Sequence, residues 1–353
     1  MLVRVSRVRA GGELLAHMTV LRVGGERHRG LKPLLGVNVV AGVTGSGKTL
    51  LAEALWLGVV HALSALLDNV WFSSSLTPAL EAYGIRPIDA EAEFCFDDVE
   101  VPGLRRGTCV KTEVRGGAEG KVTAPEDVIR NDELRRRLIY ALLHVISVPD
   151  RVKWRAAYAL HELRLIGLFE LAPEDGLQEL CLATAVLVPP VAYEDAGRIH
   201  VPCYMRMLGV PGRRMFKPGV GESLYAVASR GEMSYALFEA VYEAASRLSK
   251  LAREELGVSA VPIIYIDDAF EGLDGKKIRS LLSREYGASI YAATHRIEAG
   301  AYSARNLLLT YGTRASELVE QPPDFRFALV DAGLVESHKE VFKDVSSKLL
   351  DEA

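Results

Sequence analysis

The chain has 353 residues, in which 42 lysines and arginines face 46 aspartates and glutamates, for a formal net charge of −4. Its length fits one large α/β domain or two packed lobes, and its 49% hydrophobic and 25% charged residues exclude a disordered chain. The slightly acidic balance excludes a general polycation, so any contact with nucleic acid needs a local basic patch.

Several compositional features indicate the compartment. The N-terminus has no apolar core of signal-peptide length, and the apolar run Cys181 to Tyr193 is too short to span a bilayer. We therefore expect a cytoplasmic protein with no membrane contact. The scarcity of asparagine and glutamine indicates a thermophilic source. No C-x-x-C pair occurs, so neither a disulfide framework nor a zinc module is expected of the four cysteines Cys95, Cys109, Cys181 and Cys203.

The first half of the chain predicts strands around one long helix. Residues 1–33 alternate weakly, as edge strands do, and the β-branched run Leu35 to Ala41 predicts a buried strand. A helix with a broad apolar face is expected over 47–67. The clean alternation of Thr108 to Arg115 predicts an antiparallel hairpin with Phe94 to Val101.

The middle of the chain is more helical. Asn131 to Ile146 and Arg151 to Phe169 both have helical periodicity, and Pro149 separates them, so the pattern predicts a helical hairpin. Two further strands are expected around Ala183 to Val188 and Ile199 to Met205.

From Ser229 onward, helices and strands alternate. The expected elements are a long helix to about Leu256, a strand over Val261 to Ile266, a helix near 274–284, a strand over Ser289 to Ala293 and a solvated helix over Glu336 to Ala353.

The segment Gly42-Val-Thr-Gly-Ser-Gly-Lys-Thr49 fits the phosphate-loop pattern G-x-x-x-x-G-K-[ST] at every position, between a predicted strand and a predicted helix. Its glycines let successive N–H groups point at phosphate oxygens, Lys48 can reach the β- and γ-phosphates, and Thr49 can bind Mg²⁺. The alternative is a glycine-rich turn with an exposed lysine. The predicted ATP-binding residues here are Gly42, Thr44, Gly45, Ser46, Gly47, Lys48, Thr49 and Leu50.

An apolar strand that ends in Asp267-Asp268 provides the candidate metal and catalytic carboxylates. An acid at the carboxyl edge of a parallel strand beside a phosphate loop can orient Mg²⁺, which gives Asp267 the Walker B role. Asp268 is then placed to polarise the attacking water. The alternative is an ordinary turn at the end of a strand.

Three further features take their meaning from their order along the chain. Ser229 to Glu232 reads as a capping box, and with its serine hydroxyl and Gly231 N–H also as a second anion site. Asp274 reads as a helix N-cap. His295 ends the strand after Asp267 and can hydrogen-bond a γ-phosphate or its attacking water.

This order resembles the ABC-type ATPases, and more closely their SMC, RecF and SMC-like DNA-repair branch. The resemblance covers roughly residues 1–60 and 220–300. The similar segments are Leu35 to Ala54 for the phosphate loop, Ala228 to Met233 for the signature motif, Ile266 to Asp274 for Walker B and the D-loop, and Ala293 to His295 for the switch histidine.

The resemblance implies an ATP- and Mg²⁺-dependent ATPase that acts as a sandwich homodimer. Gly45 to Thr49 of one subunit would hold the phosphates, and Ser229 and Gly231 of the other would close on the γ-phosphate. Asp274 would lie at the dimer seam, and His295 would sense the γ-phosphate.

The chain departs from the family in three places. Asp268 stands where the family usually has glutamate, which would slow hydrolysis, and Arg230 replaces a glycine or serine of the signature. The metal-contacting glutamine of lobe I has no clear counterpart, because Gln178 is the only glutamine in the middle of the chain.

The expected fold is an α/β P-loop NTPase, a two-lobed ABC-type head with an antiparallel β-subdomain. Sustained heptads are absent, so a short helical hairpin is expected in place of long coiled-coil arms. The predicted parts are lobe I with the phosphate loop (1–125), the hairpin with an irregular insertion (126–220) and lobe II with the other motifs (221–353).

Three roles are compatible with such a head. Two basic runs, in the first forty residues and around 204–217, favour action on DNA in chromosome maintenance or repair. The acidic total and Asp268 favour a slow dimerising clamp on a protein partner, as in the crenarchaeal SMC-like arcadins of an archaeal actin. The third is an ATPase subunit of a defence or toxin system.

Overall fold

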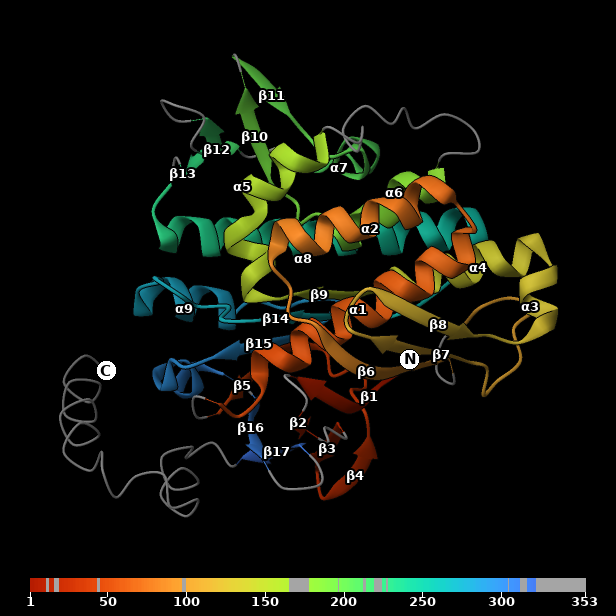
Figure 1. Ribbon diagram of the computed structural model, residues 1–353. Coiled ribbons are helices and arrows are strands. Elements are labelled where there is room, and N and C mark those ends of the chain that lie inside the picture. Colours follow the sequence, from red (N-terminus) through yellow and green to blue (C-terminus); the bar gives the residue numbers. More distant parts are fainter. Residues whose placement is uncertain are drawn as a thin grey trace.

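Three β-sheets, with helices between and around them, make up the described part of the chain (Figure 1). The computed structural model describes residues 1–10, 13–15, 19–42, 45–96, 100–164, 178–195, 197–211, 214–218, 224–226, 228–303, 305–311 and 316–321.

The largest sheet has eight strands, and its centre is parallel. The four strands β5, β15, β14 and β9 lie next to one another with almost every residue buried, as apolar strands covered on both faces require. In spatial order the strands are β4 (Glu26–Arg29), β3 (Val20–Val23), β17 (Ser316–Gln321), β16 (Arg305–Tyr311), β5 (Gly36–Ala41), β15 (Ser289–Thr294), β14 (Ile263–Ile266) and β9 (Val145–Val148).

The second sheet is antiparallel and forms the predicted β-subdomain. The strands β6 (Ile88–Cys95) and β7 (Cys109–Arg115) form an antiparallel hairpin as predicted, but β6 shares only Phe94 and Cys95 with the predicted strand Phe94 to Val101. Alternate residues of both strands are buried, which is the pattern of a sheet with one face on the core. In spatial order its strands are β2 (Glu13–Leu15), β1 (Leu2–Ala10), β6 (Ile88–Cys95), β7 (Cys109–Arg115) and β8 (Glu119–Thr123).

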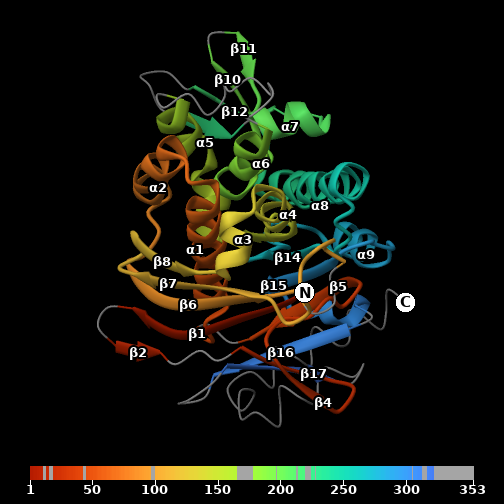
Figure 2. The same cartoon turned by 90° about the vertical axis from the view of Figure 1, so that its right-hand side faces the viewer.

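Helix α1 (Lys48–Leu67) lies where these two sheets meet. It contacts β6 and β7 of the antiparallel sheet and β9 of the large sheet, and Figure 2 shows it above β6, β7 and β8. Among the described helices it alone is long and apolar enough to cross a membrane, yet most of it is buried inside the protein. Burial on all sides explains its nearly uniform apolar composition.

A strand replaces the loop predicted between the two middle helices. Helix α4 (Asp132–Leu142) and helix α5 (Asp150–Arg164) are present, but β9 stands between them and pairs in parallel with β14. The predicted direct helical hairpin is therefore wrong. A short buried apolar run such as Val145–Val148 fits both the helical and the strand periodicity. Only its pairing with β14 makes it a strand.

The segment after α5 also differs from prediction. Residues Ala183 to Val188, predicted as a strand, belong mainly to helix α6 (Gln178–Leu187). Of the strand predicted around Ile199 to Met205, only Ile199 and His200 lie in β11 (Arg198–His200), and Cys203 begins helix α7 (Cys203–Leu208). A third sheet lies at the top of Figure 1, with the strand order β11 (Arg198–His200), β10 (Ala192–Asp195), β12 (Arg214–Pro218) and β13 (Leu224–Ala226).

The four cysteines form two disulfide bonds, contrary to the expectation of none. Cys95 and Cys109 stand opposite each other on β6 and β7, and Cys181 of α6 is bonded to Cys203 of α7. The partners are distant in sequence, so only strand register and helix packing bring their sulfur atoms together.

The remaining elements complete the two ends of the fold. The helices α2 (Val70–Tyr83) and α3 (Glu126–Arg130) belong to the first half of the chain. Helices α8 (Arg230–Leu256) and α9 (Gly275–Leu282) confirm the expected helices, and a short 3-10 helix, η2 (Ile297–Tyr302), follows β15. The predicted helix 336–353 lies outside the described residues.

Candidate functional site

The phosphate loop leaves the central strand β5 and enters α1, as predicted. Gly45 and Gly47 have φ angles of 86° and 91°, which favour glycine, and a Cβ atom on Gly42 would lie 2.5 Å from the Ser46 hydroxyl oxygen. Leu50, in the first turn of α1, is buried. The predicted contact residue Thr44 lies outside the described residues.

The lysine of this loop is buried, so the alternative of an exposed lysine is wrong. Lys48 is 4% exposed, and its Nζ donates to the carbonyl oxygen of Gly42 at 2.6 Å and lies 3.4 Å from Ser46 Oγ. Burial lowers the pKa of Lys48, and the carboxylates of Asp267 and Asp268 oppose that shift. The ammonium group is thus held inside the loop beside two acids.

Asp267 ends β14 directly beside the phosphate loop. Its carboxylate accepts a hydrogen bond from the backbone N–H of Asp150 at 3.3 Å. The residue is 2% exposed, and burial raises its pKa while the Thr49 side chain opposes that shift. The two predicted metal ligands, Thr49 and Asp267, therefore lie close enough for the Thr49 side chain to influence the Asp267 pKa.

Asp268 follows in a strained backbone conformation. Its φ angle is 44°, in the left-handed region that L-residues with a side chain rarely adopt. Burial raises the pKa of Asp268, whereas Lys153 and His295 lower it by charge. His295 is exposed just beyond β15, so the structure brings both predicted catalytic residues to one sheet edge.

Sequence reasoning missed three charged residues at this edge. Asp150 follows β9, Lys153 lies one turn into α5, and Glu271 follows Asp268. Carboxylate oxygens of Asp150, Asp268 and Glu271 lie within 4.8 Å of one another. The missed signal was the run Val145-Ile-Ser-Val-Pro-Asp150, which resembles the strand that ends in Asp267.

Gln178 is not near this group. It lies at the start of α6, and its Nε2 donates to Glu255 Oε2 of α8 at 2.8 Å. The residue that the neighbouring strand β9 brings to Asp267 is Asp150, whose backbone N–H donates to Asp267 Oδ2.

The predicted capping roles are confirmed. Ser229 and Glu232 form a reciprocal capping box at the start of α8, and Asp274 accepts the Lys277 N–H at 2.7 Å as the N-cap of α9. Ser229 is exposed, and Gly231 is buried against the backbone of Gly272. The start of α8 is thereby fixed to the segment that carries Asp274.

The first basic run is largely paired. Arg4 and Arg7 bind Glu93 and Glu91 on the neighbouring strand β6, at 2.7 and 3.0 Å. Arg22 and Arg27 both reach the carboxylate of Glu317 on β17. The local excess of positive charge counted along the sequence is therefore reduced in the fold.

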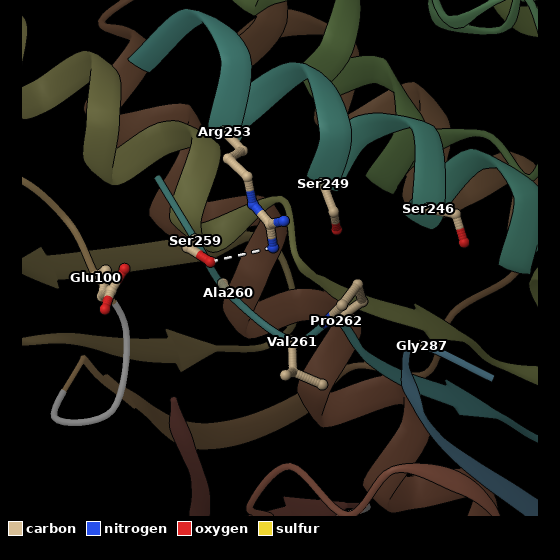
Figure 3. A pocket seen from close by; sticks show the side chains of 9 residues that line it. All are labelled: Glu100, Ser246, Ser249, Arg253, Ser259, Ala260, Val261, Pro262 and Gly287. Atoms are coloured by element: carbon tan, nitrogen blue, oxygen red, sulfur yellow. Dashed lines mark hydrogen bonds between the residues drawn. The ribbon is translucent and has the colours of Figure 1, made fainter. Parts of the chain in front are cut away.

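A cavity of about 450 Å³ lies at the opposite, amino ends of β14 and β15 (Figure 3). It contains none of the predicted site residues. Its lining comprises Glu100, Ser246, Ser249, Arg253, Ser259, Ala260, Val261, Pro262 and Gly287.

Comparisons with known proteins give distant structural likeness only. No family model and no curated protein matches the sequence. Among solved structures, the chain is similar to an SMC head bound to the C-winged helix domain of ScpA, at 10% identity over 93% of this chain and 98% of that chain, with a TM-score of 0.41.

Two further solved structures are similar to the chain at still lower scores. The SMC head domain from Thermotoga maritima has 12% identity, coverage of 91% and 98%, and a TM-score of 0.34. An ATP-binding cassette dimer in a post-hydrolysis state with ADP and Pi has 15% identity, coverage of 91% and 98%, and a TM-score of 0.26. The function proposed below therefore rests on the site geometry.

Proposed function

We propose that the chain is an ATPase that binds ATP with Mg²⁺ at the carboxyl edge of the central sheet. The single observation that carries this proposal is the burial of two opposite charges, Lys48 of the phosphate loop at 4% exposure and Asp267 at the end of β14 at 2% exposure, with Thr49 next to Lys48. Two neighbouring oxygen ligands suit Mg²⁺, and an enclosed ammonium group suits the β- and γ-phosphates.

The residues present fit the metal. Mg²⁺ prefers carboxylate and hydroxyl oxygens together with phosphate oxygens, and Asp267 is a carboxylate only 2% exposed, whose buried charge a cation would offset. When bound, the metal would neutralise charge developing on the phosphates. Asp268 would orient the attacking water, and its short side chain favours slow turnover.

We further propose that the active unit is a homodimer. Ser229 is exposed at the N-terminus of α8, and Gly231, two residues later, is buried. The phosphate loop lies elsewhere, at the N-terminus of α1. A helix N-terminus favours anions, so this end of α8 would close on the γ-phosphate held by a second copy.

DNA is the first candidate for what the ATPase acts on, and a protein partner is the second. The second gains support from the ion pairs of Arg4, Arg7, Arg22 and Arg27, which leave less positive charge for a phosphate backbone. Gel shifts across a salt series, with ATP present, separate the two. Absence of affinity at low salt would refute action on DNA.

Turnover and oligomer size, measured together, test the ATPase and the dimer. Lys48→Ala should abolish ATP binding, and Asp268→Asn should bind ATP, hydrolyse it at least about tenfold more slowly and accumulate as a dimer. A wild-type protein that neither binds nor hydrolyses ATP would refute the proposal. An Asp268→Asn variant that dimerises no better than the parent would refute the sandwich dimer.

A further inference from the structure

Lys153 occupies a place that is unfavourable for a lysine. It is 3% exposed and lies in the first turn of α5, where the helix dipole disfavours a positive charge. Burial of an ammonium group also carries a desolvation cost. A residue that breaks two local preferences at once needs compensating partners, and such conflicts gather at functional sites.

The compensating partners are all at the carboxyl edge of the sheet. The Lys153 ammonium group donates to the backbone oxygen of Asp268 at 2.9 Å and lies 3.5 Å from that of Asp267. Its Nζ also lies 3.3 Å from Asp150 Oδ1 and 3.7 Å from Glu271 Oε2. One cation thereby joins the end of β14, the start of α5 and the segment after Asp268.

The bond to Asp268 acts on a strained residue. A left-handed conformation at a residue with a side chain is unfavourable, and it persists only where surrounding contacts hold it. The ammonium group donates to the carbonyl oxygen of Asp268, the residue with the strained φ angle. Lys153 therefore ties the backbone of Asp268 to the first turn of α5.

Glu271 extends this contact to the N-terminus of α8. Its Oε1 accepts a hydrogen bond from Arg230 at 2.9 Å, and its Oε2 faces Lys153. The Trp154 ring lies under both cations, at 4.9 Å from Lys153 Nζ and 5.3 Å from Arg230 Cζ. Arg230 is the residue next to Ser229, so the chain of contacts connects the two parts of the proposed site.

We propose that Lys153 is a positioning residue that aims Asp268 at the attacking water, and that Glu271 couples this position to Arg230 at the start of α8. This inference rests on the proposed ATPase function. It also gives a role to Arg230, one of the departures from the family pattern.

Steady-state ATP hydrolysis by the full chain tests the inference, with nucleotide binding and thermal unfolding measured on the same samples. Lys153→Met should lower kcat between about tenfold and about a hundredfold while the KM for ATP changes less than about twofold, since the phosphate loop is untouched. Lys153→Arg should recover part of kcat, because a donor for the Asp268 carbonyl returns. The control Lys250→Met removes an exposed lysine of α8 that pairs only with Glu254 in the described residues, and its kcat should match wild type.

Glu271→Gln provides a second and milder variant. It keeps the shape of the side chain and the bond from Lys153 to Asp268, so kcat should fall about threefold without loss of ATP binding. Wild-type turnover together with an unchanged kcat in a folded Lys153→Met variant would overturn the positioning role alone. If Lys153→Met does not fold, a Glu271→Gln kcat equal to wild type overturns the inference. A wild-type protein without turnover would overturn the proposed function itself.

Discussion

Gly231 packs directly against the backbone of Gly272: a Cβ atom on Gly231 would lie 2.2 Å from the Gly272 carbonyl oxygen. The contact fixes the start of α8 to the segment between Asp268 and Asp274. Gly231→Ala should therefore destabilise the protein by about 1–3 kcal/mol, the usual cost of overpacking, and reduce ATP turnover. Urea unfolding and a steady-state assay measure the two effects.

Gly275→Ala is the matched control for that substitution. Gly275 begins α9 nearby, and a Cβ atom there meets nothing within 4 Å. Alanine in an unstrained helical position should leave stability equal or raised by about 0.5 kcal/mol. Equal stability of the two alanine variants would show that the contact of Gly231 with Gly272 is unimportant.

Asp267→Asn should abolish hydrolysis yet stabilise the free protein by about 1 kcal/mol at neutral pH. Burial raises the folded-state pKa of Asp267 above its ordinary value of 3.8, so the ionised carboxylate weakens the fold. In the wild type, stability from this group is complete below pH 3.8 and is lost as the pH rises through the folded-state pKa.

Urea unfolding of both proteins over a pH series, without metal, checks this expectation. The stability advantage of the asparagine variant should grow as the pH rises from about 4 toward neutrality and then level off. Mg²⁺ with ATP should stabilise the wild type more than the variant. A variant that is less stable than wild type at neutral pH would contradict the prediction.

Glu53 in α1 is fully buried and contacts two arginines from other elements. Arg86 Nε lies 3.0 Å from Glu53 Oε2, and Arg151 Nε lies 3.6 Å from Oε1. Arg86→Met should cost about 2–3 kcal/mol, because it removes the closer cation from a buried carboxylate. Glu53→Gln should cost less, because both arginines are partly exposed and remain hydrated.

A double-mutant cycle with urea unfolding measures this asymmetry. Once Glu53→Gln is present, Arg86→Met should cost less than about 1 kcal/mol. Burial is the first cause of the raised pKa of Glu53, and the arginines oppose it, so the loss in Arg86→Met should diminish at acidic pH. Equal losses from Arg86→Met in both backgrounds would contradict this explanation.

The disulfide between Cys95 and Cys109 should stabilise the antiparallel sheet. The two residues are 14 positions apart, and closing a loop of this size is worth about 3 kcal/mol in the chain-entropy description. Replacement of both by serine should lower the free energy of unfolding by about that amount. Thiol titration of denatured, unreduced protein should find none of the four cysteines free, and four free thiols would contradict the pairing.

Local sequence determined the parts of the site that depend on neighbouring residues. The phosphate loop, the capping box of Ser229 and Glu232 and the N-cap Asp274 each need hydrogen bonds only within a few positions, so their residue patterns suffice to predict them. The strands β5, β14 and β15 were predicted for a similar reason, since each is an apolar run with clear ends.

Tertiary structure alone decided which distant residues meet. Val145–Val148 is a strand because it pairs with β14. That pairing brings Asp150 and Lys153 to the sheet edge where β14 ends and Asp267 follows. The Cys95–Cys109 disulfide and the ion pair of Arg4 with Glu93 likewise depend on strand register, whereas the Cys181–Cys203 disulfide depends on the packing of α6 on α7. Length thus allowed one large α/β domain or two packed lobes, and net charge excluded a general polycation. Contacts between strands far apart in the chain decided where the charges lie, because register is set by packing of whole sheets.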